Sequence, residues 1–73
     1  SMVNVDKLKG KIVEKRSSIE ELSKVLGIGR STLYRRFSSD GSGFTIREAD
    51  LIAKALNLSG NEACAIFFAQ YVA

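Results

Sequence analysis

A helix-start signal occurs three times in the sequence, and this repetition constrains the fold more than any other feature. In each case a Ser or Thr precedes a Glu by three residues, in the pairs Ser18 and Glu21, Thr45 and Glu48, and Ser59 and Glu62. In such a pair the hydroxyl accepts a hydrogen bond from the backbone N–H of the Glu, while the carboxylate accepts one from the backbone N–H of the Ser or Thr. Apolar residues follow each pair at spacings of three and four. The sequence therefore predicts three capped helices.

Two further helices are expected outside these signals. The first is expected to begin near residues 4 to 6 and to end around residue 15, because Val5, Leu8 and Ile12 share one helical face. The second covers residues 30–37. The chain has no proline, and 73 residues suffice for one compact core. We therefore expect an all-α fold, a compact bundle of about five short helices that forms a single domain over residues 2–73.

Three smaller expectations concern the flexible or small residues of the chain. Gly10, inside the first helix, either permits close approach of a neighbouring backbone or is simply tolerated. Residues 38–43, rich in Ser and Gly, are expected to be a flexible loop with little order beyond turns. Cys64 is expected to be a small buried hydrophobe, since no activating partner lies near it in the sequence.

The charge of the chain is unevenly distributed. Residues 1–36 carry nine Lys and Arg against four Asp and Glu, whereas the remaining residues carry two against four. A basic N-terminal half favours a polyanionic partner, although charged helix faces are often only solvated surface.

Several function classes are disfavoured by composition. The chain has no histidine and one cysteine, so it offers no set of metal ligands, and it has no Gly-rich phosphate loop. We expect no catalytic residue, no metal, no cofactor and no small-molecule ligand. Because no apolar run approaches the roughly 20 residues that cross a bilayer, we expect no membrane segment and a cytoplasmic location.

Residues 18–37 are the most informative stretch. They join two short amphipathic helices through a turn at Leu26, Gly27 and Ile28. A glycine one residue beyond a helix end adopts the left-handed conformation without a Cβ clash, and Ile28 can then fold back onto the core. Ser23 is small enough for the next helix to cross beside it. This pattern predicts a helix-turn-helix.

The spacing of the apolar and small residues in this stretch also resembles a known family. Leu22, Ser23, Leu26, Gly27, Ile28 and Leu33 are placed as in the helix-turn-helix of the phage repressor and Cro (XRE-type) regulators. Residues 8–15, 44–46, 52–58 and 66–68 are similar to small phage Cro-like proteins of Gram-positive bacteria. The resemblance implies a lambda-repressor-like fold and a sequence-specific transcriptional regulator of phage or prophage type that binds double-stranded DNA with residues 29–37.

Three positions depart from the family pattern. Ser23 stands where alanine is usual, Gly29 where serine is frequent, and Arg36 where an aliphatic residue is usual. With Arg36 at that position, Phe37 is expected to take over the contact with the core.

The proposed recognition helix then presents two groups of polar residues. Leu33 and Phe37 are expected to face inward, and arginine has the planar donor pair that matches guanine O6 and N7. The residues expected to contact bases are Arg30, Ser31, Tyr34 and Arg35. The residues expected to contact phosphates are Ser18, Lys24, Thr32 and Arg36.

Other partners and functions remain open at this point. Phe67 and Phe68 are adjacent and cannot both face one core, so one of them, or Tyr71, is expected to be exposed and to form a homodimer surface. The alternative is a monomer whose core both rings close from two sides. The competing functions are a protein-interaction module, such as an antirepressor or adaptor, and a DNA-targeting accessory factor in recombination.

Overall fold

Residues 2–72 are described by the computed structural model, and they form an all-helical bundle. In chain order the elements are α1 (Val5–Glu14), α2 (Ile19–Leu26), α3 (Arg30–Ser38), α4 (Ile46–Ala55), α5 (Gly60–Phe67) and the short 3-10 helix η1 (Ala69–Tyr71). No strand occurs within residues 2–72. The predicted all-α fold with five α-helices is therefore confirmed.

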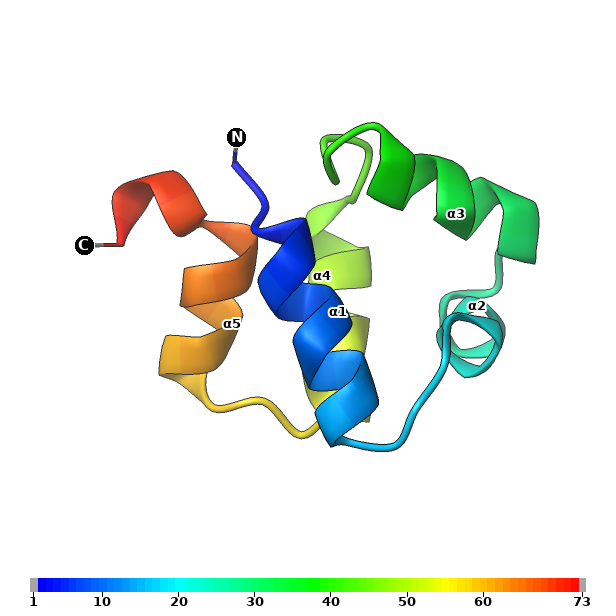
Figure 1. The fold of residues 1–73 in the computed structure, drawn as a ribbon, viewed down its shortest axis with the longest axis horizontal. Coiled ribbons are helices and arrows are strands. Elements are labelled where there is room, and N and C mark those ends of the chain that lie inside the picture. Colours follow the sequence, from blue (N-terminus) through cyan, green and yellow to red (C-terminus); the bar gives the residue numbers. More distant parts are fainter. Residues whose placement is uncertain (1, 73) are drawn as a thin grey trace.

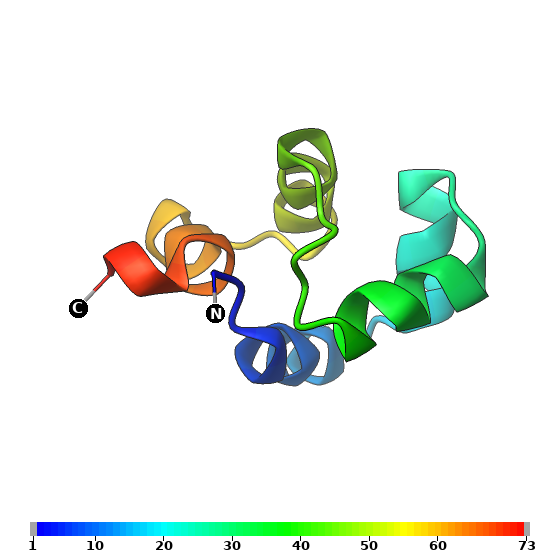
Figure 2. The ribbon, with the colours of Figure 1, turned by 90° about the horizontal axis from the view of Figure 1, so that it is seen from above.

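Along the long axis of the molecule α5 lies toward one end, α1 and α4 lie in the middle, and α2 and α3 lie at the other end (Figure 1). The view from above places α4 on the far side of α1, and α4 packs against both α2 and α5 (Figure 2). None of the helices over residues 2–72 has the length and apolar character that a bilayer crossing requires.

Ser18, Thr45 and Ser59 all cap helices, as the sequence predicted. The Ser18 hydroxyl accepts from the Glu21 backbone N–H at 3.1 Å, and Thr45 and Ser59 form complete capping boxes with Glu48 and Glu62. The first helix is capped by Asn4, whose Oδ1 accepts from the backbone N–H of residue 7 at 3.0 Å. Each cap satisfies a backbone donor that a helix end leaves free, which fixes where the helices begin.

The core is built from one apolar face of each helix. Its fully buried side chains are Leu8, Leu22, Leu33, Ile52, Leu56 and Ile66. Phe37 is buried as well, so the expectation that it takes over the core contact of the third helix is confirmed. The Phe44 ring lies edgewise between Phe37 and Phe67, with centroid distances of 5.8 and 6.0 Å. These rings join α3 to α5 across the segment that leads into α4.

The expectations for the small residues need correction. A Cβ at Gly10 would have no atom of a neighbouring element within 4 Å. The prediction that Gly10 permits close approach of a neighbouring backbone is therefore wrong, and the alternative, that the helix simply tolerates a glycine here, remains. Cys64 is exposed rather than buried, because α5 turns Ile66 and Phe67 to the core and leaves Cys64 beside α4 at the surface.

The segment after α3 is also more ordered than the sequence suggested. The Gly41 backbone N–H donates to the Arg36 carbonyl at 2.7 Å, and the Phe44 N–H donates to the Gly41 carbonyl at 3.2 Å. Gly41 itself is buried against Val3. Residues 39–43 are turns as predicted, but Ser38 belongs to α3, and the packing of Gly41 on Val3 adds order that the sequence did not suggest.

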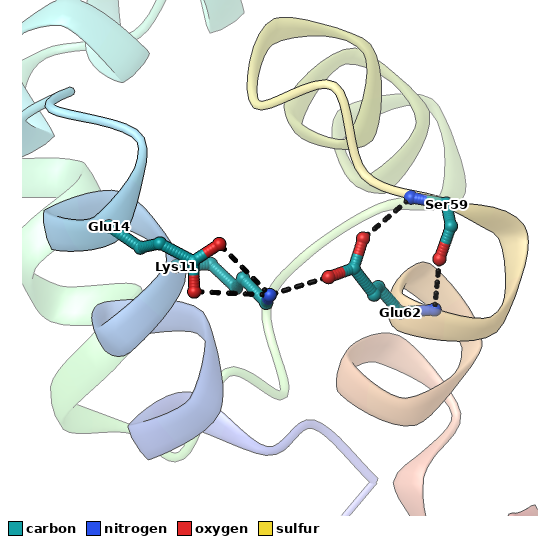
Figure 3. Close-up of polar contacts among 4 residues, drawn as sticks. All are labelled: Lys11, Glu14, Ser59 and Glu62. Atoms are coloured by element: carbon teal, nitrogen blue, oxygen red, sulfur yellow. Dashed lines mark hydrogen bonds and ion pairs between the residues drawn. The ribbon is translucent and has the colours of Figure 1, made fainter.

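A charged cluster joins α1 to the start of α5 (Figure 3). The Lys11 ammonium lies 2.5 Å from Glu62 Oε2 and 3.2 Å from Glu14 Oε2, and Glu62 Oε1 accepts from the Ser59 N–H at 2.8 Å. The hydrogen bond from Lys11 and that from the Ser59 backbone lower the pKa of Glu62 to about 2, and the same carboxylates raise the pKa of Lys11. The cluster ties together two helices that lie far apart in the sequence.

Strong acid should weaken this connection. Because the pKa of Glu62 in the folded chain is about 2 against an ordinary value of 4.5, its contribution to stability is present above about pH 4.5 and is lost as the pH falls toward 2. We expect Glu62→Gln to make the melting temperature less dependent on pH between about pH 5 and 2.5. Glu14→Gln is the matched control, since it leaves the contact between Lys11 and Glu62 in place. Equal slopes for the wild type and Glu62→Gln would contradict the assignment.

Candidate nucleic-acid interface

The corner between α2 and α3 has the geometry that the sequence predicted. Gly27 ends α2 in the left-handed conformation, with φ +71° and ψ 29°. Its N–H donates to the Lys24 carbonyl at 3.3 Å, and the Ile28 N–H donates to the Ser23 carbonyl at 3.1 Å. This is the hydrogen-bond pattern of a Schellman motif. Ile28 packs on the core as expected, which fixes the direction in which the chain leaves α2.

The two helices cross steeply, and α3 lies along the outer edge of the molecule (Figure 2). Ser23 is buried on α2, and its hydroxyl donates to the Glu20 carbonyl at 2.7 Å. A hydroxyl satisfied within its own helix leaves no polar group unpaired, so serine is accommodated at a position where the family usually has alanine. The small side chain allows the crossing that presents α3 outward.

The outward face of α3 carries all four residues that were expected to contact bases. Leu33 and Phe37 point into the core. The exposed residues are Arg30, Ser31, Tyr34 and Arg35. Tyr34 is 51% exposed, so about half of it is accessible at the surface. Their contacts with bases remain a prediction.

The four residues expected to contact phosphates differ in how exposed they are. Ser18, the cap of α2, and Lys24 on α2 are exposed. Thr32 is half-buried on α3, where its hydroxyl accepts from Arg35 Nη2 at 3.2 Å. Arg36 behaves differently from the other three. Its guanidinium forms an ion pair with Glu48, so it is turned toward α4 rather than free on the surface.

The contact between Arg36 and Glu48 links α3 to the capping box of α4. The Glu48 side chain is 8% exposed, and its Oε1 also accepts from the Thr45 N–H at 2.9 Å. The Arg36 Cζ lies 5.9 Å from the centroid of the Phe44 ring. Burial raises the pKa of Glu48, but the Thr45 N–H and the Arg36 guanidinium outweigh it, and the net pKa lies below its ordinary value. The pair therefore remains charged and fixes α3 relative to α4.

Sequence reasoning did not find this pairing. Glu48 was identified only as a capping residue, and Arg36 only as a departure from an aliphatic pattern. An arginine at a position that usually faces the core was the available signal, since a partly buried guanidinium requires an acidic partner.

An open concavity of about 430 Å³ lies beside the C-terminal half of α3. Arg35, Arg36 and three hydroxyl residues line it, namely Thr32, Ser38 and Ser39. Ser38 and Ser39 were not among the residues singled out in the sequence. Of the two guanidinium groups at this open surface, that of Arg36 is already paired with Glu48. Within residues 2–72, no three His, Cys, Asp or Glu side chains gather as a metal site would require.

The steep crossing of α2 and α3, the glycine corner and the exposed polar face together define a helix-turn-helix domain. A helix-turn-helix family model matches residues 9–62, which is more than half of the chain. The chain belongs to this family, the XRE-type helix-turn-helix proteins, which are regulators that bind DNA. No curated protein and no solved structure matches the chain significantly.

Proposed function

We propose that this protein is a sequence-specific transcriptional regulator of the phage or prophage Cro/repressor type, acting on double-stranded DNA in the cytoplasm. The observation that carries the proposal is the row of Arg30, Ser31, Tyr34 and Arg35 on the exposed face of α3. A helix of this width fits the major groove, and its N-terminal residues reach deepest. Arg30, the first residue of α3, is the leading candidate for a contact with guanine.

Phosphate contacts would fix the orientation of α3 in the groove. Lys24, Ser18 and Thr32 flank the exposed face, and the Ser38 hydroxyl lines the concavity near the other end of α3. The neighbouring Ser39 hydroxyl already donates to the Arg36 carbonyl at 3.2 Å. Such contacts set register without carrying sequence information. Arg36 is paired with Glu48, so a phosphate contact by this residue would require its guanidinium to leave that partner.

We further propose that the protein forms a homodimer through the apolar face between α4 and α5. Ile46 is 79% exposed and Phe68 is 42% exposed, and both line two adjoining apolar grooves of about 210 and 170 Å³. Phe67 is buried in the core and supports this face from beneath, whereas Tyr71 lies exposed beyond it. A twofold dimer would place two α3 helices on half-sites about one DNA turn apart.

The same apolar face favours a second candidate function, a protein-interaction module. An antirepressor or adaptor would use this surface for a different protein and would bind DNA weakly at any salt concentration. Selection from a randomised duplex library, followed by salt titration on the enriched site and on scrambled DNA, separates the two. A palindromic motif with affinity that falls steeply as salt rises supports the dimeric regulator. No enriched motif and no binding at low salt would support the interaction module.

A pair of arginine and lysine variants tests the division between base and phosphate contacts. Arg30→Ala is expected to weaken binding to the enriched site by about 1 to 3 kcal/mol and to relax the preference at one base pair. Lys24→Ala, the control, is expected to weaken binding to all sequences alike and to reduce the salt slope by about one. If Arg30→Ala weakens every sequence equally, Arg30 contacts only phosphate.

A further inference from the structure

The first residue of α3 has an acidic partner on the preceding helix. Arg30 Nη1 lies 3.8 Å from Glu20 Oε2, and the two side chains are 63% and 61% exposed. Glu20 belongs to the first turn of α2, so the contact spans the whole turn between the helices. Of the ion pairs within residues 2–72, the one between Arg30 and Glu20 involves a residue of the exposed face of α3.

An acidic residue at this place opposes simple attraction to DNA. A carboxylate beside a DNA-reading surface repels phosphates, and the first turn of α2 carries two, Glu20 and Glu21. Stabilisation of the positive end of α2 explains an acidic residue at either position. It does not explain why one of them lies against Arg30.

We propose that Glu20 is a positioning residue that holds the Arg30 guanidinium for a guanine edge and thereby sets the base preference at that position. This inference rests on the proposed function of α3 as the DNA-reading helix. A free arginine adopts many rotamers and contacts phosphates as readily as bases, whereas a carboxylate beside the guanidinium limits its directions. In water a pair at 3.8 Å is weak, but it strengthens where a DNA surface excludes water.

The expected consequence is a gain in specificity at the expense of affinity. Glu20 lowers the affinity for every DNA sequence by repelling phosphates, and it lowers the affinity for the wrong base further by keeping Arg30 away from alternative contacts. Removing only its charge should therefore raise overall affinity and flatten the preference at one base pair.

The test compares Glu20→Gln, Glu21→Gln, Arg30→Ala and the wild type in the same randomised-library selection, with affinities for the enriched and scrambled duplexes. Glu21→Gln is the matched control, because it removes the same charge from the neighbouring residue, whose side chain does not contact Arg30. Arg30→Ala identifies the base pair that Arg30 reads. Both Gln variants should bind scrambled DNA about twofold to fivefold more tightly at low salt. Glu20→Gln alone should reduce the preference at the Arg30 position, by about threefold to tenfold.

Each other outcome overturns the proposal, and for a different reason. Equal base preferences in Glu20→Gln and Glu21→Gln would mean that Glu20 acts only through its charge, with the reading helix unaffected. Loss of preference at many positions together would indicate a structural effect on α2. If Arg30→Ala changes no single position, Arg30 is not a base reader and Glu20 has nothing to position. If the wild type enriches no motif, the proposed function fails, and this inference fails with it.

Discussion

Gly41→Ala is expected to lower the free energy of unfolding by about 3 kcal/mol, because two penalties combine at this residue. Gly41 has φ +75°, and a Cβ there would lie 2.7 Å from the Val3 Cβ and 2.8 Å from its Cγ1. The left-handed conformation disfavours any side chain, and the Val3 side chain is itself buried in the core. For a domain of this size, such a loss lowers the melting temperature by about 12 to 24 °C. Urea titration and thermal unfolding followed by circular dichroism measure both quantities.

Two other glycines separate the two penalties. Gly27 has φ +71° but open space around its Cα, so Gly27→Ala should show the conformational penalty alone, about 1 to 2 kcal/mol. Gly10 is helical with open space, so Gly10→Ala should stabilise the protein by up to about 1 kcal/mol. A loss for Gly41→Ala no larger than that for Gly27→Ala would show that the segment after α3 does not dock on Val3.

The features predicted correctly from the sequence depend on residues close together in the chain. A capping hydroxyl and its Glu are three residues apart, and the Gly27 corner is defined by its immediate neighbours, so Ser18, Thr45, Ser59 and Gly27 could be assigned without tertiary information. The inward positions Leu33 and Phe37 follow from helical periodicity in the same way. The exposed face of α3 was predictable for this reason.

The features that were missed depend on contacts between distant parts of the chain. Gly41 was interpreted as flexible because its neighbours are Ser and Gly, but it packs against Val3, which lies far from it in the sequence. Cys64 was assigned to the core from its residue type alone, whereas the rotation of α5 is fixed by Ile66 and Phe67. The partner of Arg36 is twelve residues away, across a loop whose path the sequence does not specify.

Glu48→Ala is expected to lower the free energy of unfolding by about 2 to 3 kcal/mol, since it removes a cap and leaves a partly buried guanidinium without its partner. Glu48→Gln retains an oxygen that can accept from the Thr45 N–H but loses the charge, so its loss should be smaller. The pKa of Glu48 lies below its ordinary value of 4.5, so its contribution is present above about pH 4.5 and is lost as the pH falls. The differences among the three proteins should therefore shrink in acid.

Glu48→Ala and Arg36→Met together test where the Arg36 guanidinium binds when the protein is bound to DNA. In Glu48→Ala the guanidinium loses its internal partner while lining the concavity at Ser38 and Ser39, so it is expected to reach a phosphate and to steepen the salt dependence of DNA binding by about one unit of slope. Arg36→Met should leave the wild-type slope unchanged, because its long apolar side chain keeps the packing and removes a charge that is already engaged by Glu48. A slope reduced by about one in Arg36→Met would mean that Arg36 exchanges Glu48 for phosphate on binding. In that case the contact with α4 would hold the free protein in shape and open when DNA is bound.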